Sequence, residues 1–595
     1  MSPPGASHHG QPWRTCMTAV VFMGFLAMIV WRLYDLQVVH ADDLSERALR
    51  QRMRTVAIEA QRGNIFDTNG KPLVVSHAGW DLFADPTYMN DKLQATVKIA
   101  QIAGVDRATL RGHFEAATNG RRILRNVDDD VAEAIRELGL QGVYLRRSYR
   151  RDYPADALAP QVLGFVLDDE RGGGGIEARF DEHLRGIPGS ERILVDVRGR
   201  RMLGQDPERT PARPGGHVHL TLDANIQMAA ERAVLGAVER HRPESASAIV
   251  LRPATGEVLA MVSYPSFDPR QLAEAEMAGF RNNALAFVYE SGSVMKPLMV
   301  GAAVADGLSG WDQRIFCENG QWNIQVGRAR RLLRDHSWRQ GGNGWLTITE
   351  ALAKSDNIMP AKLGLKMGPE RMHHWADTFN FGRRTGIELP GENVGIMRPK
   401  ERWDRINSAI SVPIGYEVSV TPLQMIAAHA AVANRGVWNT PHLVSHLQRW
   451  SDERQRWIEA SPEVRRERRR ILSEADSLAI ESAMRTVMES GTGRRVQLDG
   501  WSSAGKTGTT RKVINGQYSS EHHIGSLVAW APARPDRTPD FIALVTVDAP
   551  EKGTGYFGGL TAGPVVKEIL EFALDYEGVP RDDEVKAQGN QGRGR

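Results

Sequence analysis

The sequence predicts an α+β protein in which one N-terminal membrane helix is followed by two folded regions. Three observations support this fold class. Residues 15–31 contain no charged side chain and are mostly apolar. The chain has 595 residues, which is too long for a single hydrophobic core. Both later regions combine hairpin signals with the apolar spacing of helices. The composition, 41% hydrophobic and 25% charged, is that of a folded protein.

The balance of charge and cysteine excludes several classes of site. The net charge of +3 indicates no particular partner. The main basic run, residues 465–470, continues into Ile471 and Leu472 and is typical of the solvated face of a helix. We therefore expect no nucleic-acid partner. The chain has two cysteines, Cys16 and Cys317, too few for a zinc site or a disulfide framework. We expect no metal, and no pairing of Cys16, which lies in the apolar stretch.

The apolar stretch at residues 15–31 is long enough to cross a membrane. Seventeen residues at about 1.5 Å each span roughly 25 Å, the short end for a membrane helix. Arg14 and Arg32 flank the stretch and can extend their charges to the interface. Aromatic residues suited to the interface lie nearby, at Trp13, Trp31 and Tyr34.

A cleaved signal peptide is the alternative, because residues 39–41 form an acceptable cleavage site. Arg32 and Asp35 separate that site from the apolar core, which favours an uncleaved anchor at residues 15–34. Basic residues flank both sides, so charge does not settle the orientation. We place the tail, residues 1–14, in the cytoplasm because the chemistry described below requires an extracytoplasmic substrate.

The first folded region, residues 35–215, carries no catalytic constellation. Asn69-Gly70 lies between two apolar runs and predicts a β-hairpin. Residues 91–140 have helical apolar spacing. We therefore expect this region to be a non-catalytic pedestal, serving in dimerisation or interaction with other proteins.

The second folded region, residues 216–578, begins with a strand that ends at Asp223, the expected N-cap of a helix. Residues 248–251 and 258–262 flank a Pro-Ala-Thr-Gly turn and predict a hairpin. The remaining residues, 579–595, are polar and glycine-rich, and we expect them to be disordered.

Ser293 and Lys296 are three residues apart at a predicted turn into a helix, so their side chains share one face. A serine hydroxyl is a weak nucleophile until a base takes its proton. A lysine can be that base only where burial or a second cation lowers its pKa. Such pairs also occur by chance on solvated helices, so the pair needs further partners.

Two further motifs supply those partners, and the ordered set of three is specific. Ser355-Asp356-Asn357 lies inside a helix predicted to start near Thr349. A second cation and further hydroxyls follow beside two predicted strands, in Lys506-Thr507-Gly508-Thr509. Penicillin-binding proteins and class A β-lactamases share this trio in this order.

With these motifs the sequence resembles a class B penicillin-binding protein of the division-specific (septal) type, known as penicillin-binding protein 3. The resemblance covers residues 32–574. It includes Arg62-Gly63, Tyr153-Pro154, Gly175-Ile176-Glu177, Thr255-Gly256-Glu257, Thr421-Pro422-Leu423-Gln424 and Tyr556-Phe557-Gly558-Gly559. The chain departs from the family pattern at Ser291, usually proline, and at Glu417, usually glycine.

The resemblance implies an elongated α/β pedestal and a transpeptidase domain, in which helices flank an antiparallel sheet beside a mostly helical subdomain. It also implies that Ser293 attacks a peptidoglycan stem peptide ending in D-Ala-D-Ala, while Lys296 takes the serine proton. Neutral Lys296 requires its pKa to fall by about three pH units from roughly 10.4, through burial and the charge of Lys506. The resemblance assigns the relay of that proton to Ser355, and substrate binding to Asn357, Lys506, Thr507, Gly508 and Thr509.

The resemblance also implies the setting of the reaction. No cofactor or metal is needed, and β-lactams acylate the same serine as inhibitors. We expect a single-pass protein of the inner (cytoplasmic) membrane with its catalytic domain in the periplasm. The expected protein partners are a membrane-embedded glycan polymerase and division proteins.

Four alternatives use the same residues. The chain could serve cell elongation instead of division, or use water as the acceptor and act as a D,D-carboxypeptidase. A class A β-lactamase carries a Glu-x-x-Leu-Asn stretch for deacylation, and this sequence contains no Leu-Asn dipeptide. A penicillin sensor or idle scaffold is disfavoured because every catalytic motif residue is intact.

Overall fold

The structure is a computed structural model that describes residues 12–85, 88–89, 91–116, 121–195, 208–326, 329–460 and 466–585. The chain divides into two compact units. One unit contains residues 1–60 and 187–213, and the other contains residues 61–186 and 214–595.

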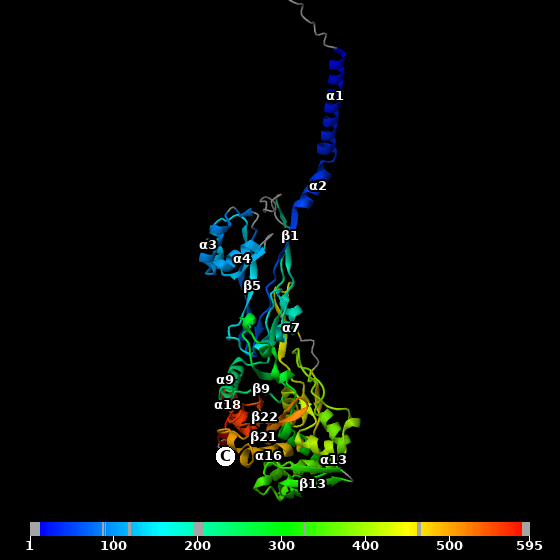
Figure 1. Ribbon diagram of the computed structural model, residues 1–595, viewed down its shortest axis with the longest axis vertical. Helices are drawn as coiled ribbons and strands as arrows, with labels where there is room; N and C mark the ends of the chain where they lie inside the picture. The colour runs from blue at the N-terminus through cyan, green and yellow to red at the C-terminus, as the bar shows by residue number, and fades with distance from the viewer. Residues whose placement is uncertain are drawn as a thin grey trace, which may run out of the picture. The chain divides into compact units, whose positions relative to one another are not determined.

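The first unit contains the predicted membrane helix. α1 (Pro12–Tyr34) is followed by a short π-helix and by α2 (Ala41–Arg52) (Figure 1). The side chains of α1 are exposed along its apolar length, as expected of a helix that contacts lipid. In the described part of the chain, this is the one helix with the length and composition of a single membrane-spanning anchor. After α2, the chain forms a three-stranded sheet in the order β1 (Met53–Ile58), β6 (Gly189–Leu194) and β7 (Arg209–Thr210).

The second unit begins with the hairpin predicted at Asn69-Gly70. Its strands are β2 (Ile65–Phe66) and β3 (Pro72–Ala84), and β3 continues into pairing with β4 (Arg121–Val127) and β5 (Val143–Asp152). Three helices pack against these strands: α3 (Lys92–Ala103), α4 (Arg107–Ala116) and α5 (Asp129–Glu137). Residues 91–140 are therefore not helical throughout. β4 interrupts the helices because it pairs with β3 and buries Ile123 in their common core.

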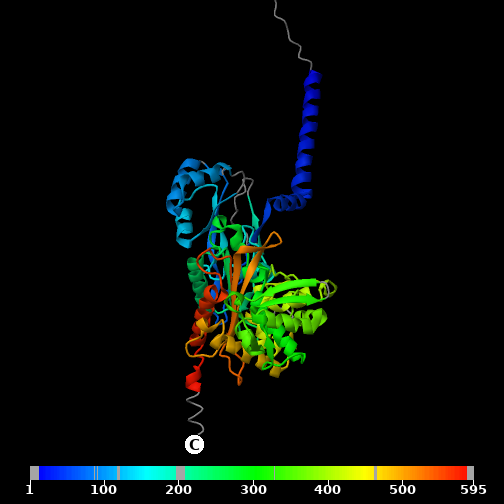
Figure 2. The same ribbon diagram turned by 60° about the horizontal axis from the view of Figure 1, so that its bottom comes forward.

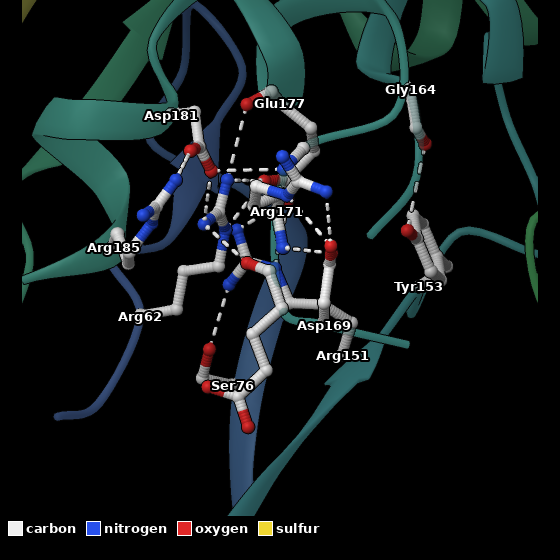
Figure 3. A network of polar contacts seen from close by, with 12 residues as sticks. Arg62, Ser76, Arg151, Tyr153, Gly164, Asp169, Arg171, Glu177, Asp181 and Arg185 are labelled. Carbon is white, nitrogen blue, oxygen red and sulfur yellow. Dashed lines mark hydrogen bonds and ion pairs between the residues drawn. The ribbon is translucent and has the colours of Figure 1, made fainter. Parts of the chain in front are cut away.

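A buried ion-pair network joins distant segments of this part of the unit (Figure 3). Glu177 is fully buried and accepts hydrogen bonds from Arg62 Nε at 2.7 Å and from Arg151 Nε at 2.8 Å. Arg62 also donates to Asp181 at 2.7 Å, and Arg151 donates to Ser76 at 2.7 Å. Each charge in the network is paired, which is the condition for burying a carboxylate without a large penalty.

One sheet continues from these strands into the C-terminal part of the unit. β2 pairs in parallel with β8 (His217–Leu220), and β8 pairs with β18 (Val444–Ser451). The strand order is β19-β18-β8-β2-β3-β4, with β5 paired to β3 and β19 spanning Arg456–Ala460. This ladder of backbone hydrogen bonds connects residues 61–84 to the rest of the unit.

The core of the unit is a five-stranded antiparallel sheet in the order β10-β9-β23-β22-β21. Successive side chains of β9 face opposite sides, as a strand requires. Ala248 and Val250 face a core formed with α9 and α18, whereas Ile249 and Leu251 face a core formed with α11 and α15. In Figure 2, α9 and the red α18 lie along one side of the orange strands. The bounds are β9 (Ser245–Leu251), β10 (Val258–Tyr264), β21 (Ala504–Ile514), β22 (Gln517–Ala531), β23 (Phe541–Asp548), α9 (Ala224–His241), α11 (Lys296–Ala305), α15 (Pro422–Ala433), α16 (Glu474–Ser490) and α18 (Gly563–Tyr576).

Local predictions in this region are confirmed where the signal was a turn or a cap. β9 and β10 form the predicted hairpin, and Asp223 caps α9 by accepting from the backbone N–H groups of Asn225 and Ile226. Cys16 and Cys317 are both free.

The helix predicted at residues 465–470 is wrong. In the described part of that run, Arg468–Arg470 forms β20, which pairs with β17 (Val437–Asn439). The guanidinium groups donate to backbone carbonyls instead of being wholly solvated: Arg469 donates to Thr378 at 3.0 Å and Arg470 to Arg435 at 2.8 Å.

The disorder predicted from residue 579 onward is wrong for residues 579–585. Trp501 Nε1 donates to the Val579 carbonyl at 3.1 Å, and the Asp582 amide donates to the Gly500 carbonyl at 2.8 Å. These bonds fix the segment against residues 500–502. Residues 586–595 and most of the predicted tail at residues 1–14 lie outside the described residues.

Candidate active site

Ser293 lies on a tight turn that leads into a buried helix. The turn is the 3₁₀ helix η5 (Gly292–Met295), and Lys296 is the first residue of α11. Ser293 is half-buried, whereas Lys296 is completely buried. The turn follows β11 (Tyr289–Glu290), which pairs with β16 (Ser419–Val420). The sequence expectation of a turn running into a helix is confirmed.

The Ser355-Asp356-Asn357 motif lies between two helices and not inside one, which corrects the sequence prediction. α12 (Ile348–Ala353) ends before the motif and α13 (Ile358–Thr378) begins after it. The break has a backbone cause, because Ser355 has a φ of +58°, a conformation that costs a non-glycine residue about 1–2 kcal/mol. Asp356 then caps α13 by accepting from the amides of Ile358 and Met359, each at 2.8 Å.

Lys506 to Thr509 lie within β21, the edge strand of the five-stranded sheet. Glycine at 508 is required by the close approach of β21 to η5. A Cβ atom there would lie 2.6 Å from Val294 Cγ2 and 2.5 Å from Ser526 Oγ. Gly292 lies on the other side of the same contact and has a φ of +56°. A Cβ atom on Gly292 would lie 2.3 Å from Thr510 Cγ2. The two glycines therefore bring the serine turn against the edge strand.

The Ser355 hydroxyl lies between the amino groups of two buried lysines. Lys506 Nζ donates to Ser355 Oγ at 2.9 Å, and Lys296 Nζ lies 3.4 Å from the same oxygen. Lys296 Nζ also donates to the Ser355 carbonyl at 2.6 Å and to Asn357 Oδ1 at 2.8 Å. Among the hydrogen bonds of the described residues, none joins Lys296 to the hydroxyl of Ser293. The structure thus brings Lys296, Ser355, Asn357 and Lys506 into one hydrogen-bonded cluster next to the serine turn.

Burial makes Lys296 a base near neutral pH. Desolvation of the ammonium form lowers the pKa of Lys296 from its ordinary 10.5 to about 8. The carboxylates of Asp335 and Asp356 oppose this effect, since negative charge favours the protonated lysine.

Burial also lowers the pKa of Lys506 well below its ordinary value, and the positive charge of Lys296 adds to the effect. The sequence prediction placed this repulsion on Lys296. The repulsion is mutual, so the charge on either lysine lowers the pKa of the other, and the two amines titrate as a coupled pair.

Two residues of the cluster were missed by the sequence analysis. Asp335 is buried and accepts the Asn357 amide at 3.1 Å, which holds the Ser355 turn in place. Burial raises the pKa of Asp335, but hydrogen bonds from His336 and Ser337 outweigh it, so the pKa lies well below the usual range. Thr492 shares a 2.8 Å hydrogen bond with the hydroxyl of Thr507. The Gly-Thr-Gly sequence around Thr492 was the available signal for that turn.

Two family models match the chain. The penicillin binding protein transpeptidase domain matches residues 246–571, and the penicillin-binding protein dimerisation domain matches residues 57–220. The chain belongs to the class B penicillin-binding proteins.

Similar proteins cover nearly the whole of this class B penicillin-binding protein. Stage V sporulation protein D of Bacillus subtilis is 30% identical over 96% of the chain and 88% of its own length. Peptidoglycan D,D-transpeptidase FtsI of Escherichia coli is 29% identical over 94% of the chain and 91% of its own length. Among solved structures, penicillin-binding protein 3 of Mycobacterium tuberculosis, complexed with aztreonam, has a TM-score of 0.67 and 25% identity, covering 88% of this chain and 98% of that one.

The two departures from the family pattern lie directly behind the serine turn. Glu417 has a φ of +67°, the region that favours the glycine usual in the family. Its amide donates to Glu290 Oε1 at 2.7 Å, and its carboxylate accepts from Ser408 at 2.7 Å and pairs with Arg398. Ser291 is fully buried, and its hydroxyl finds no hydrogen-bond partner among the described residues.

Proposed function

We propose that this chain is a peptidoglycan D,D-transpeptidase that cross-links stem peptides through an acyl-enzyme on Ser293. The observation that carries the proposal is the placement of the Ser355 hydroxyl between two buried lysines, beside the turn that presents Ser293. The transpeptidase domain match and the names of the similar proteins support the same reaction.

In the proposed mechanism, Ser293 Oγ attacks the carbonyl carbon of the D-Ala-D-Ala bond and neutral Lys296 takes the hydroxyl proton. The pKa of about 8 leaves part of Lys296 neutral at pH 7. Ser355 passes a proton to the departing D-Ala amine, because its hydroxyl contacts both lysines. The amine of a second stem peptide then attacks the ester, forms the cross-link and returns the serine hydroxyl.

The edge strand β21 supplies the binding side of the proposed site. Lys506 and the hydroxyls of Thr507 and Thr509 bind the terminal carboxylate, and Gly508 lets the strand approach the serine turn. Asn357 donates to the substrate amide. Backbone N–H groups of Ser293 and Thr509 stabilise the oxyanion, an effect worth about 3–4 kcal/mol for each donor.

We further propose that residues 35–215 are a non-catalytic interaction domain and that residues 216–578 are the transpeptidase domain. The anchor at residues 15–34 lies in the inner (cytoplasmic) membrane, with both domains in the periplasm, where the substrate lies. The role is septal, alongside a membrane-embedded glycan polymerase and division proteins. Depletion of the protein should give long undivided cells, whereas wide or rounded cells would indicate a role in elongation.

The proposed nucleophile is tested with a fluorescent β-lactam. We expect the wild-type protein to form a long-lived covalent adduct, and we expect the tryptic peptide containing Ser293 to carry the label. Ser293→Ala should abolish labelling while the thermal unfolding curve remains cooperative. Labelling of the alanine variant, or rapid release of hydrolysed β-lactam by the wild type, would exclude the assignment in favour of another nucleophile or of a β-lactamase.

A further inference from the structure

A two-stranded hairpin next to the catalytic cluster has one buried and one exposed face. Its strands are β13 (Gln321–Val326) and β14 (Ala329–Arg334), paired antiparallel with Gln321 opposite Arg334. The inner face contributes Ile324 and Leu333 to a small core with α13 and α14 (Asn407–Ser411). The outer face is formed by six exposed side chains: Gln321, Asn323, Gln325, Arg330, Leu332 and Arg334.

This outer face is positively charged and carries no balancing acid. Neither strand contains an aspartate or glutamate. Within the described part of the chain, Arg330 and Arg334 have no carboxylate partner. Arg334 lies 4.5 Å from the ring centroid of Trp338, and exposed Arg339 lies 5.2 Å from the same ring. Exposed Arg111, by contrast, pairs with Glu115 at 2.7 Å. Arg334 Nε also donates to Gln321 Oε1 at 3.3 Å. The outer face thus has the Arg330 guanidinium and the remaining N–H groups of Arg334 available to bind anions.

The hairpin is attached directly to the catalytic cluster. Asn357 Nδ2 donates to the Arg334 carbonyl at 3.2 Å, and the Asn357 amide donates to Asp335 at 3.1 Å. The Asp335 amide in turn donates to the Gly320 carbonyl at 2.8 Å. The ends of both strands therefore lie next to the Ser355 turn.

We propose that the outer face of this hairpin binds a peptidoglycan strand through the free carboxylates of its stem peptides. The inference rests on the function proposed above, which places such a strand at Ser293. A guanidinium group binds a carboxylate through two parallel hydrogen bonds, which makes arginine well suited to this partner. The three amide side chains of β13 supply donors and acceptors for peptide or sugar groups between the charges. The hairpin then holds the polymer along a track that ends at the acylation site.

The test uses the full-length protein in detergent and purified, uncross-linked peptidoglycan strands. Two strand preparations are compared, one with free stem-peptide carboxylates and one in which they are amidated. Arg330→Glu reverses a charge on the outer face near the turn end of the hairpin, opposite Gln325. We expect it to weaken binding to free-carboxylate strands by about tenfold or more, and binding to amidated strands much less. Arg330→Gln should lie between the wild type and Arg330→Glu.

The matched control is Arg107→Glu, which makes the same charge change at an exposed position on α4. Unchanged binding by Arg330→Glu, an equal loss with amidated strands, or an equal loss in Arg107→Glu would overturn the inference. Labelling of Ser293 by a fluorescent penicillin is measured in each variant. Failure of wild-type labelling would refute the proposed function, whereas normal labelling with charge-independent strand binding would refute the hairpin proposal alone.

Discussion

Asp335 opposes the effect of burial on the pKa of Lys296, and Asp335→Asn tests this directly. Burial lowers the pKa of Lys296 from 10.5 to about 8 even though Asp335 opposes it. At 1.36 kcal/mol per pH unit, the difference amounts to about 3 kcal/mol against the ammonium form. At pH 7 roughly a tenth of Lys296 is then neutral, which is on the order of 300-fold more than for an unperturbed lysine.

The asparagine variant removes one negative charge that stabilises the ammonium form. The pKa of Lys296 should therefore fall further, and the neutral amine should persist to lower pH. Asparagine retains an oxygen that can accept the Asn357 amide, although it replaces the oxygen that accepts from the Ser337 amide. The assay is the second-order rate of acylation by a fluorescent penicillin, measured from about pH 6 to about pH 9. For the wild type we expect the rate to rise about tenfold per pH unit and to level off near pH 8. For Asp335→Asn we expect a curve of acylation rate against pH that has the same shape and a midpoint at lower pH.

The control is Asp312→Asn, which removes an exposed carboxylate and should leave the midpoint where it is. A midpoint for Asp335→Asn that stays in place or moves to higher pH would refute the electrostatic reasoning. A wild-type rate that is flat from about pH 6 to about pH 8 would refute Lys296 as the base.

Three further predictions concern the cluster and the network behind it. Lys506→Gln removes the amino group that donates to Ser355 Oγ, and the acylation rate should fall about 100-fold or more; a rate near wild type would contradict this role. Gly508→Ala should slow acylation by about tenfold or more because the added methyl forces β21 away from the serine turn, as read from labelling time courses. Glu177→Gln leaves the buried Arg151 guanidinium without a carboxylate partner and Arg62 with Asp181 alone, and urea unfolding should show a loss of about 3–5 kcal/mol. Exposed Glu115→Gln should cost less than about 1 kcal/mol, and equal losses would count against the network.

Much of the fold was predictable where the determinants are local. The β9–β10 hairpin and the Asp223 cap of α9 follow from turn and cap residues that act within a few positions. The three catalytic motifs were located by their order and spacing, and the structure places Lys296 and Lys506 around a single hydroxyl.

The remaining features depend on contacts that no local pattern encodes. Asp335 acts on a residue 22 positions later in the chain, and its own neighbourhood carries no catalytic motif. The helical pattern around Thr349 does not show that the helix ends before Ser355. The break is imposed by the positive φ of Ser355 and by Asp356, which caps the following helix. The apolar spacing of residues 91–140 predicts helix where the structure has β4. Pairing with β3, and not periodicity, determines the conformation of this strand.

The continuous sheet β19-β18-β8-β2-β3-β4 has a mechanical consequence. Because β2 pairs directly with β8, residues 61–84 are not connected to the catalytic part by a flexible linker alone. A force applied to β3 is transmitted through backbone hydrogen bonds between neighbouring strands as far as β18. Any change in angle between these parts must twist or bend the sheet, and the elastic cost of that deformation returns the parts to one orientation. The sheet therefore acts as a stiff spring between β3 and the strands beside the catalytic core.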